Sequence, residues 1–114
     1  MPKQNYYEKG QLTDLAYLVL VTLTKPRHGY SIMNEISSIT EGMINIGPAS
    51  LYTTLKKLTD AGLIQLIEDS EKKKVYFITD DGLEGLLIDI EKRKRLAECG
   101  LRALTEYKEG NQNV

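Results

Sequence analysis

The sequence predicts a mainly α-helical protein with a small β-hairpin, in which three short helices and the hairpin precede one long C-terminal helix. Apolar residues that recur three or four positions apart indicate helices both before residue 61 and after residue 79. Two short β-prone runs, 64–68 and 74–78, are separated by five polar residues and indicate the hairpin. A chain of 114 residues is long enough for one modest core and short enough to gain from oligomerisation.

The segment 47–63 is the element around which the other helices are arranged. Gly47 and Pro48 suit the start of a helix, because proline at the first helical position has no N–H to satisfy, and Gly62 suits its end. One narrow stripe faces a core and consists of Leu51, Leu55 and Leu58. The opposite face is small, hydroxylic, aromatic and cationic, and carries Ala49, Ser50, Tyr52, Thr53, Lys56 and Asp60. We interpret this segment as a recognition helix that a groove or a backbone can approach closely.

Two further helices are expected before it. From Leu12 to Leu23 the sequence is almost wholly apolar, so the first helix has to be covered on more than one face, which indicates a partner chain. Pro26 and Gly29 then break the chain, and a second helix runs from about residue 30 to residue 40. Its expected inward residues are Ile32, Met33, Ile36 and Ile39. Three short helices with tight connections are typical of a helix-turn-helix arrangement.

The hairpin follows the recognition helix directly, which is the position of a wing. Alternation predicts that one face carries Ile64, Leu66, Val75 and Phe77, and that the other carries Gln65 and Tyr76. The tip and return strand hold a run of three cations, Lys72, Lys73 and Lys74, with the acidic residues Glu68, Asp69 and Glu71 beside it. Two interpretations stay open for this charge run: contact with phosphates, or a merely solvated face.

A long helix begins after Thr79, whose side chain suits an N-cap, and Asp80 and Asp81 favour the positive end of its dipole. A heptad seam runs through Leu83, Leu87, Ile90, Lys94, Ala97, Leu101, Leu104 and Lys108. From residue 80 to residue 108 the helix reaches roughly 43 Å at 1.5 Å per residue, more than so small a domain can cover. Most of the seam is therefore expected to meet the same helix, or the first helix, of a second subunit.

The expected organisation is a winged helix-turn-helix domain with an N-terminal arm at 1–79, a dimerisation helix at 80–109 and a disordered tail at 110–114. The expected dimerisation residues are Leu12, Leu15, Val19, Leu83, Leu87, Ile90, Ala97, Leu101 and Leu104.

Composition narrows the classes of function. A net charge of −1 and a pI near 5.8 argue against nucleic-acid binding when taken alone, so charge has to be considered locally. No run approaches the ~20 apolar residues of a membrane span, and nothing marks secretion, so we expect a cytoplasmic protein. His28 and Cys99 are the only residues of their types and have no partner spacing for catalysis or metal binding. We therefore expect that the protein is not an enzyme and that it binds neither a metal ion nor a cofactor.

The recognition helix and the wing together predict binding to double-stranded DNA. The expected contact residues are Tyr30, Ser31, Pro48, Ala49, Ser50, Tyr52, Thr53, Lys56, Lys72, Lys73 and Lys74. A two-fold axis would place two recognition helices about 34–36 Å apart, which is one turn of DNA.

A different class of function is also open: a winged-helix module that binds another protein, with the wing lysines against an acidic surface of that protein. The acidic pI is compatible with this alternative.

Several motifs, in this order, resemble the PadR family of bacterial transcriptional regulators over roughly residues 10–108. They are His28-Gly29-Tyr30, Gly47-Pro48-Ala49-Ser50-Leu51-Tyr52 with Leu55 and Leu58, Gly62-Leu63-Ile64, and Lys74-Val75-Tyr76-Phe77-Ile78-Thr79 with Gly82. The single C-terminal helix is similar to the short subfamily. The resemblance implies a homodimer that joins through its last and first helices. It also implies a repressor that binds a palindromic promoter site and is released by small, often aromatic molecules.

Two departures from the family pattern concern the wing and the effector. Lys73 and Lys74 stand where family members often have arginine, which keeps the attraction to phosphate and loses the bidentate fork. The chain has no tryptophan, whereas relatives that bind flat drugs in a central pore use one on the last helix. Tyr6, Tyr7 and Tyr17 offer aromatic walls for a small-molecule effector, and a fully packed interface is the alternative.

Overall fold

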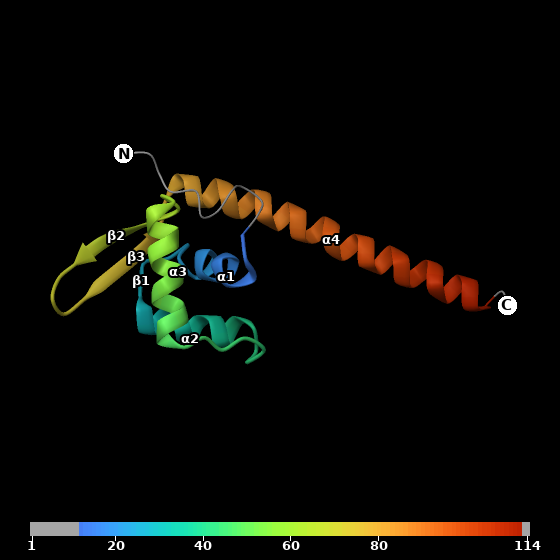
Figure 1. Ribbon diagram of the computed structural model, residues 1–114, viewed down its shortest axis with the longest axis horizontal. Helices are drawn as coiled ribbons and strands as arrows, with labels where there is room; N and C mark the ends of the chain where they lie inside the picture. The colour runs from blue at the N-terminus through green and yellow to red at the C-terminus, as the bar shows by residue number, and fades with distance from the viewer. Residues whose placement is uncertain (1–11, 113–114) are drawn as a thin grey trace.

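Four helices and three strands follow one another in the computed structural model, which describes residues 12–112 (Figure 1). In chain order they are α1 (Asp14–Thr22), β1 (Arg27–His28), α2 (Gly29–Ile39), α3 (Pro48–Asp60), β2 (Ile64–Asp69), β3 (Lys74–Ile78) and α4 (Asp80–Gln112). The predicted fold class is confirmed: mainly helical, with a small antiparallel sheet and a long C-terminal helix. The predicted N-terminal arm, residues 1–11, lies outside the described residues, as do residues 113–114.

Helix α1 lies at the centre of the domain and packs against α2, α3 and α4. Thr13 caps it, because its Oγ1 accepts a hydrogen bond of 3.1 Å from the N–H of Ala16. Ala16, Val19 and Leu20 are completely buried within the chain's own core. The all-round apolar pattern of this helix is therefore explained largely by its central position in one chain, rather than by a partner chain as predicted.

Helix α3 has the predicted boundaries. Gly47 is its N-cap and Pro48 its first residue. At the other end Gly62 adopts a φ of 78°, and the N–H of Leu63 donates to the carbonyl of Leu58 at 2.9 Å. This left-handed glycine closes the helix and turns the chain into the wing. The predicted core stripe is fully buried and consists of Leu51, Leu55 and Leu58.

Helix α2 follows the prediction with one exception. Ile32 and Ile36 are buried in the core and Met33 packs against it. Ile39, predicted to face inward, is 44% exposed. It is the last residue of α2, next to the C-cap Thr40.

The wing is a three-stranded antiparallel sheet with the strand order β1-β3-β2, rather than the predicted two-stranded hairpin. In the additional strand, Arg27 pairs with Tyr76 and His28 pairs with Val75. Only two residues long, β1 shows no alternation in the sequence. Its conformation comes from pairing with a strand that is distant along the chain. The result is that the start of α2 is attached to the wing.

The predicted alternation of the hairpin is wrong for two residues. Tyr76 is only 8% exposed, as buried as Val75 on the opposite predicted face, and Leu66 is 37% exposed, unlike Ile64 on the same predicted face. Strand β3 is central in the sheet, which favours burial on both of its faces. In β2 a bulge between Leu66 and Glu68 leaves Ile67 without a partner and shifts the register.

Helix α4 is fixed to the domain at its first turn. Thr79 is the predicted N-cap: its Oγ1 donates to the carbonyl of Gly62 at 2.7 Å and accepts from the N–H of Gly82 at 3.0 Å. Gly82 lies so close to the carbonyl of Leu63 that a Cβ at this position would overlap it. The glycine is needed for this close approach of helix to backbone.

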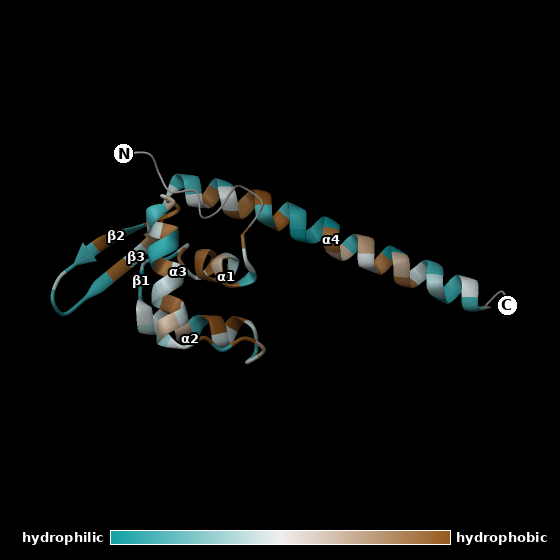
Figure 2. Ribbon diagram, in the orientation of Figure 1, coloured by the Kyte–Doolittle hydropathy of each residue, from teal (hydrophilic) through white to brown (hydrophobic). Residues whose placement is uncertain are grey.

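Beyond the domain α4 continues further than predicted. It extends to Gln112, so residues 110–112 are helical rather than part of a disordered tail. At 1.5 Å per residue the helix is about 50 Å long. Apolar residues recur along much of this length, including the part that projects away from the other elements (Figure 2). No helix within residues 12–112 combines the length and the apolarity needed to cross a membrane.

Candidate nucleic-acid interface

The polar face of α3 is exposed as predicted and divides into two flanks. Pro48, Ala49, Ser50 and Thr53 are exposed, and the last three line a hollow beside Leu15 of α1. Tyr52, on the other flank, is 52% exposed and points toward the wing. Lys56 is exposed one turn further on and forms an ion pair of 3.1 Å with Asp60. Hydroxyl, aromatic and cationic groups are thus presented on one face that is backed by the leucine stripe.

The flank of Tyr52 opens into a groove of about 520 Å³ between α3, the start of α2 and the wing. We call this surface the wing groove. It is lined by His28, Gly29, Tyr30, Tyr52, Ser70, Glu71, Lys72, Lys73, Lys74 and Tyr76. Five of the eleven predicted contact residues come together here from three separate segments of the chain. The sequence indicated these segments one by one but not their meeting.

Tyr52 joins the recognition helix to the base of the wing. A Cβ at Gly29 would lie 2.7 Å from the hydroxyl oxygen of Tyr52, so the phenol rests against the glycine backbone. Burial raises the pKa of the Tyr76 phenol, and the nearby Tyr52 and Asp69 raise it further. Tyr76 therefore remains a neutral hydrogen-bonding group at physiological pH. The absence of a side chain at Gly29 allows the start of α2 to pack against Tyr52 of the recognition helix.

The lysines of the wing are held by a tight turn. The N–H of Ser70 donates to the carbonyl of Lys73 at 2.8 Å, and the N–H of Lys73 donates to the hydroxyl of Ser70 at 3.1 Å. All three lysines are exposed. Glu71 lines the same groove and Asp69 is close enough to act on Tyr76, so the local field combines three cations with two carboxylates. The excess of positive charge at the tip favours a polyanion over a neutral surface.

His28 is a functional candidate that the sequence did not reveal. It is a strand residue of β1 and the N-cap of α2. Its Nδ1 accepts a hydrogen bond of 3.3 Å from the N–H of Ser31. A ring that accepts at Nδ1 carries its proton at Nε2 when neutral, which leaves one donor for the wing groove.

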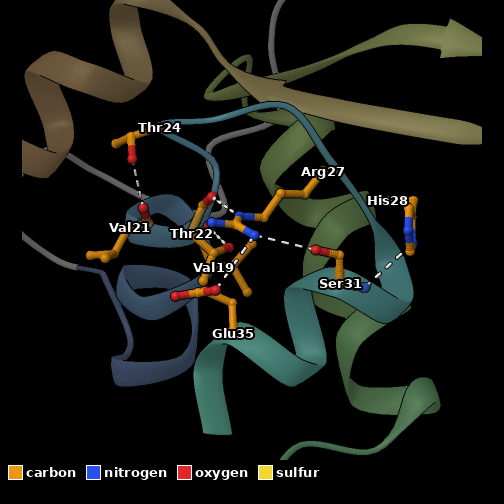
Figure 3. Close-up of polar contacts among 8 residues, drawn as sticks. All are labelled: Val19, Val21, Thr22, Thr24, Arg27, His28, Ser31 and Glu35. Carbon is orange, nitrogen blue, oxygen red and sulfur yellow. Dashed lines mark hydrogen bonds and ion pairs between the residues drawn. The ribbon is translucent and has the colours of Figure 1, made fainter. Parts of the chain in front are cut away.

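Arg27 fixes the segment that carries His28 (Figure 3). Its Nε donates to the carbonyl of Thr22 at 2.8 Å, and its Nη1 lies 3.3 Å from the hydroxyl of Ser31 and 3.5 Å from Glu35. These contacts join the end of α1, strand β1 and the first turns of α2. Ser31, a predicted DNA contact, is half-buried, and its hydroxyl belongs to this internal network.

The predicted dimerisation residues lie in two different environments. Most of the α4 seam is exposed, at 47% for Leu83, 62% for Leu87, 65% for Leu101 and 58% for Leu104. Ala97 is also exposed, whereas Ile90 and Leu15 are partly buried against the core. Leu12 and Val19 are buried in the chain's own core, so they are not surface residues that a partner can contact.

Within residues 12–112 no three histidine, cysteine or acidic side chains are grouped so that they could hold a metal ion. Cys99 is exposed.

Comparison with known proteins identifies the family. The model of the transcriptional regulator PadR-like family matches residues 18–86, which is more than half of the chain and includes the recognition helix and the wing. The chain belongs to the PadR-like family of transcriptional regulators. The resemblance deduced from the motifs is thereby confirmed.

Individual relatives of this PadR-like chain agree with that assignment. The transcriptional regulator YqjI of Escherichia coli is 28% identical over 85 residues, which span 74% of this chain and 40% of that protein. A PadR family transcriptional regulator from Eggerthella lenta has a similar structure, with a TM-score of 0.63, 28% identity and coverage of 81% of both chains. Bacillus subtilis PadR in complex with operator DNA gives a TM-score of 0.57 at 31% identity, covering 66% of this chain and 45% of that one.

Proposed function

We propose that this PadR-like chain is a cytoplasmic, homodimeric repressor that binds a palindromic promoter site and is released by a small-molecule effector. The observation that carries the proposal is the wing groove, in which the recognition helix, the start of α2 and three wing lysines line one exposed surface. The similarity to Bacillus subtilis PadR, whose structure contains operator DNA, supports this assignment.

The recognition helix and the wing have different roles in DNA binding. The hydroxyls of Ser50 and Thr53 and the ammonium of Lys56 face outward on α3, where they can reach base edges and phosphates in the major groove. Lys72 and Lys73 at the wing tip supply sequence-independent attraction to phosphates. Because the whole chain has a net charge of −1, this attraction is confined to the interface.

The dimer supplies the symmetry that a palindromic site requires. The exposed leucines of α4 form an apolar stripe that a second copy of the helix can cover by coiled-coil packing. Such a pair would present two α3 helices to successive major grooves, about 34–36 Å apart. The effector would lie between the two copies, near α1 and α4. Of the tyrosines proposed to form its walls, Tyr17 is partly buried against the core, and Tyr6 and Tyr7 lie outside the described residues.

The proposal is tested by gel shift with DNA from upstream of the protein's own gene, at two salt concentrations. We expect a specific complex that weakens steeply with salt, because each neutralised phosphate releases counterions. Lys73→Ala should weaken binding to specific and random DNA alike, and should lower the salt slope by about one. Lys25→Ala, which removes an exposed lysine that does not line the wing groove, is the matched control.

Tyr52→Phe tests the recognition helix. The ring stays against Gly29 and only the hydroxyl is lost, so thermal stability should change little. Binding to the specific fragment should fall by about 1 kcal/mol, the contribution of one hydrogen bond, with little change on random DNA. If the protein shifts no upstream fragment better than random DNA at low salt, the repressor proposal fails and docking of a protein partner becomes the better explanation.

A further inference from the structure

A cluster of contacts surrounds Arg93 on α4. Its Nε lies 2.5 Å from Asp89, its Nη1 lies 2.7 Å from Asp14, and its Nη2 donates to the carbonyl of Leu12 at 3.1 Å. The guanidinium also stacks over the ring of Tyr17, at 4.2 Å from the ring centroid. Asp14 and Tyr17 are on α1, and Leu12 lies two residues before its start. One side chain therefore connects α4 to the start of the first helix.

The buried carboxylate of Asp89 requires this connection. Asp89 is 1% exposed and is the only buried charged residue within residues 12–112. A buried carboxylate is strongly unfavourable without a hydrogen-bonded partner, and Arg93 provides that partner. Burial lowers the pKa of the Arg93 guanidinium, but hydrogen bonds to Asp89 and Asp14 outweigh it, so the pKa is raised overall. Only a planar fork reaches Asp89, Asp14 and a carbonyl at once.

Arg93 is also the last point at which α4 is covered by its own domain. Gly82, Leu86 and Asp89 are buried and Arg93 is partly buried, whereas every residue from 94 to 111 is exposed. In Figure 1 this part of α4 extends away from all other elements. The contacts of Arg93 thus lie at the position from which the projecting part of the helix would tilt.

We propose that Arg93 is a positioning residue that sets the angle of α4 to the winged helix-turn-helix domain, and thereby the distance between the two recognition helices of the dimer. This inference rests on the proposed function, because it requires a dimer that reads two half-sites. The part of α4 beyond Arg93 is about 28 Å long at 1.5 Å per residue. A tilt of about 10° at Arg93 would displace its far end by about 5 Å, more than the 3.4 Å rise of one base pair along a strand. Arg93 acts through this angle and does not touch DNA.

The experiment measures how strictly the dimer discriminates half-site spacing. A binding site is first selected from random-sequence DNA with the wild-type protein. Versions of that site with one or two base pairs inserted or deleted at its centre are then compared by fluorescence anisotropy. The variants are Arg93→Lys, Arg93→Gln and Asp14→Asn, and the matched control is Arg95→Gln. Arg95 is an exposed arginine on the same helix and lies outside the seam.

We expect the wild type and Arg95→Gln to lose about tenfold in affinity for each base pair inserted or deleted, equivalent to 1.4 kcal/mol. Arg93→Lys should reduce this discrimination to within about threefold while affinity for random DNA is unchanged. Asp14→Asn should reduce it less, because Asp89 and Leu12 still hold the arginine. Arg93→Gln leaves the buried Asp89 unpaired, so unfolding of that variant would itself confirm the pairing, and Asp14→Asn would then carry the test. Asp14 is exposed, so its substitution should fold normally.

The outcomes separate the two proposals. If the wild type selects no site from random DNA, or is monomeric by sedimentation at micromolar concentration, the proposed function fails. If the wild type selects a two-fold site and both Arg93→Lys and Asp14→Asn keep its full spacing discrimination, the function stands and the role of Arg93 is refuted. If Arg93→Lys and Asp14→Asn fold but are less stable, and neither relaxes the spacing, the role of Arg93 is also refuted, because a merely structural contact predicts that result.

Discussion

The two halves of α4 belong to one continuous helix and yet differ in what stabilises them. In the first half, Asp80 to Arg93, the residues Gly82, Leu86 and Asp89 are buried against the domain. In the second half, residues 94–112, Leu101 and Leu104 are exposed without a partner in the chain. Isolated helices of this length are marginal in water, so the second half needs a partner to be stable, whereas the first does not. Arg93 therefore marks the end of the part of α4 that its own domain covers, and the exposed seam beyond it is the part for which we propose a second copy as the partner.

The largest expected effect comes from breaking the second half. Leu101→Glu combined with Leu104→Glu places two carboxylates on the apolar seam, so we expect monomers in analytical ultracentrifugation. Affinity for a two-fold DNA site should fall by about 10²–10⁴-fold, because the second half-site is no longer bound by a linked copy. Arg102→Glu, on the same turn but outside the seam, is the control and should remain dimeric. A dimer that survives the double substitution would show that α4 is not the main interface.

A smaller effect is expected in the first half. In Gly82→Ala the added Cβ would overlap the carbonyl of Leu63 and press on the side chain of Ile78. Overpacking of this kind destabilises by about 1–3 kcal/mol, which urea unfolding would measure as a lower midpoint. Gly85→Ala is the control one turn away, because a Cβ at residue 85 meets nothing within 4 Å. If both substitutions have the same effect, the close approach at Gly82 does not fix the start of α4.

The features that the sequence predicted well are those set by local chemistry. Gly47, Gly62 and Thr79 delimit α3 and α4 as expected, because capping depends on residues a few positions apart. The core stripe of α3 was equally clear, since its helical period identifies Leu51, Leu55 and Leu58 without knowledge of their partners. The exposed face of the same helix follows from the same period.

The features that were missed depend on pairing between distant segments. Strand β1 is a strand only because β3 lies beside it, and Tyr76 is buried because its strand is central in the sheet. Val19 was assigned to a dimer interface because an all-round apolar helix has two explanations, a partner chain or a central position. The hydrogen bond from Arg93 to Asp14 joins residues 79 positions apart, and no pattern of residue spacing in the sequence predicts it. The wing groove was missed for the same reason.

The smallest effect is expected from Gly100→Ala in the second half of α4. Gly100 is exposed and a Cβ there meets nothing within 4 Å, so alanine should favour the helix by about 0.5–1 kcal/mol. Thermal unfolding of the dimer should therefore shift upward, opposite in sign to the effect of Gly82→Ala. Because residue 100 adjoins Leu101 of the seam, the same variant also reports on the partner: a weaker dimer would mean that the second helix approaches the backbone at Gly100. An unchanged dimer with a higher melting temperature would place the partner helix at a normal side-chain distance there.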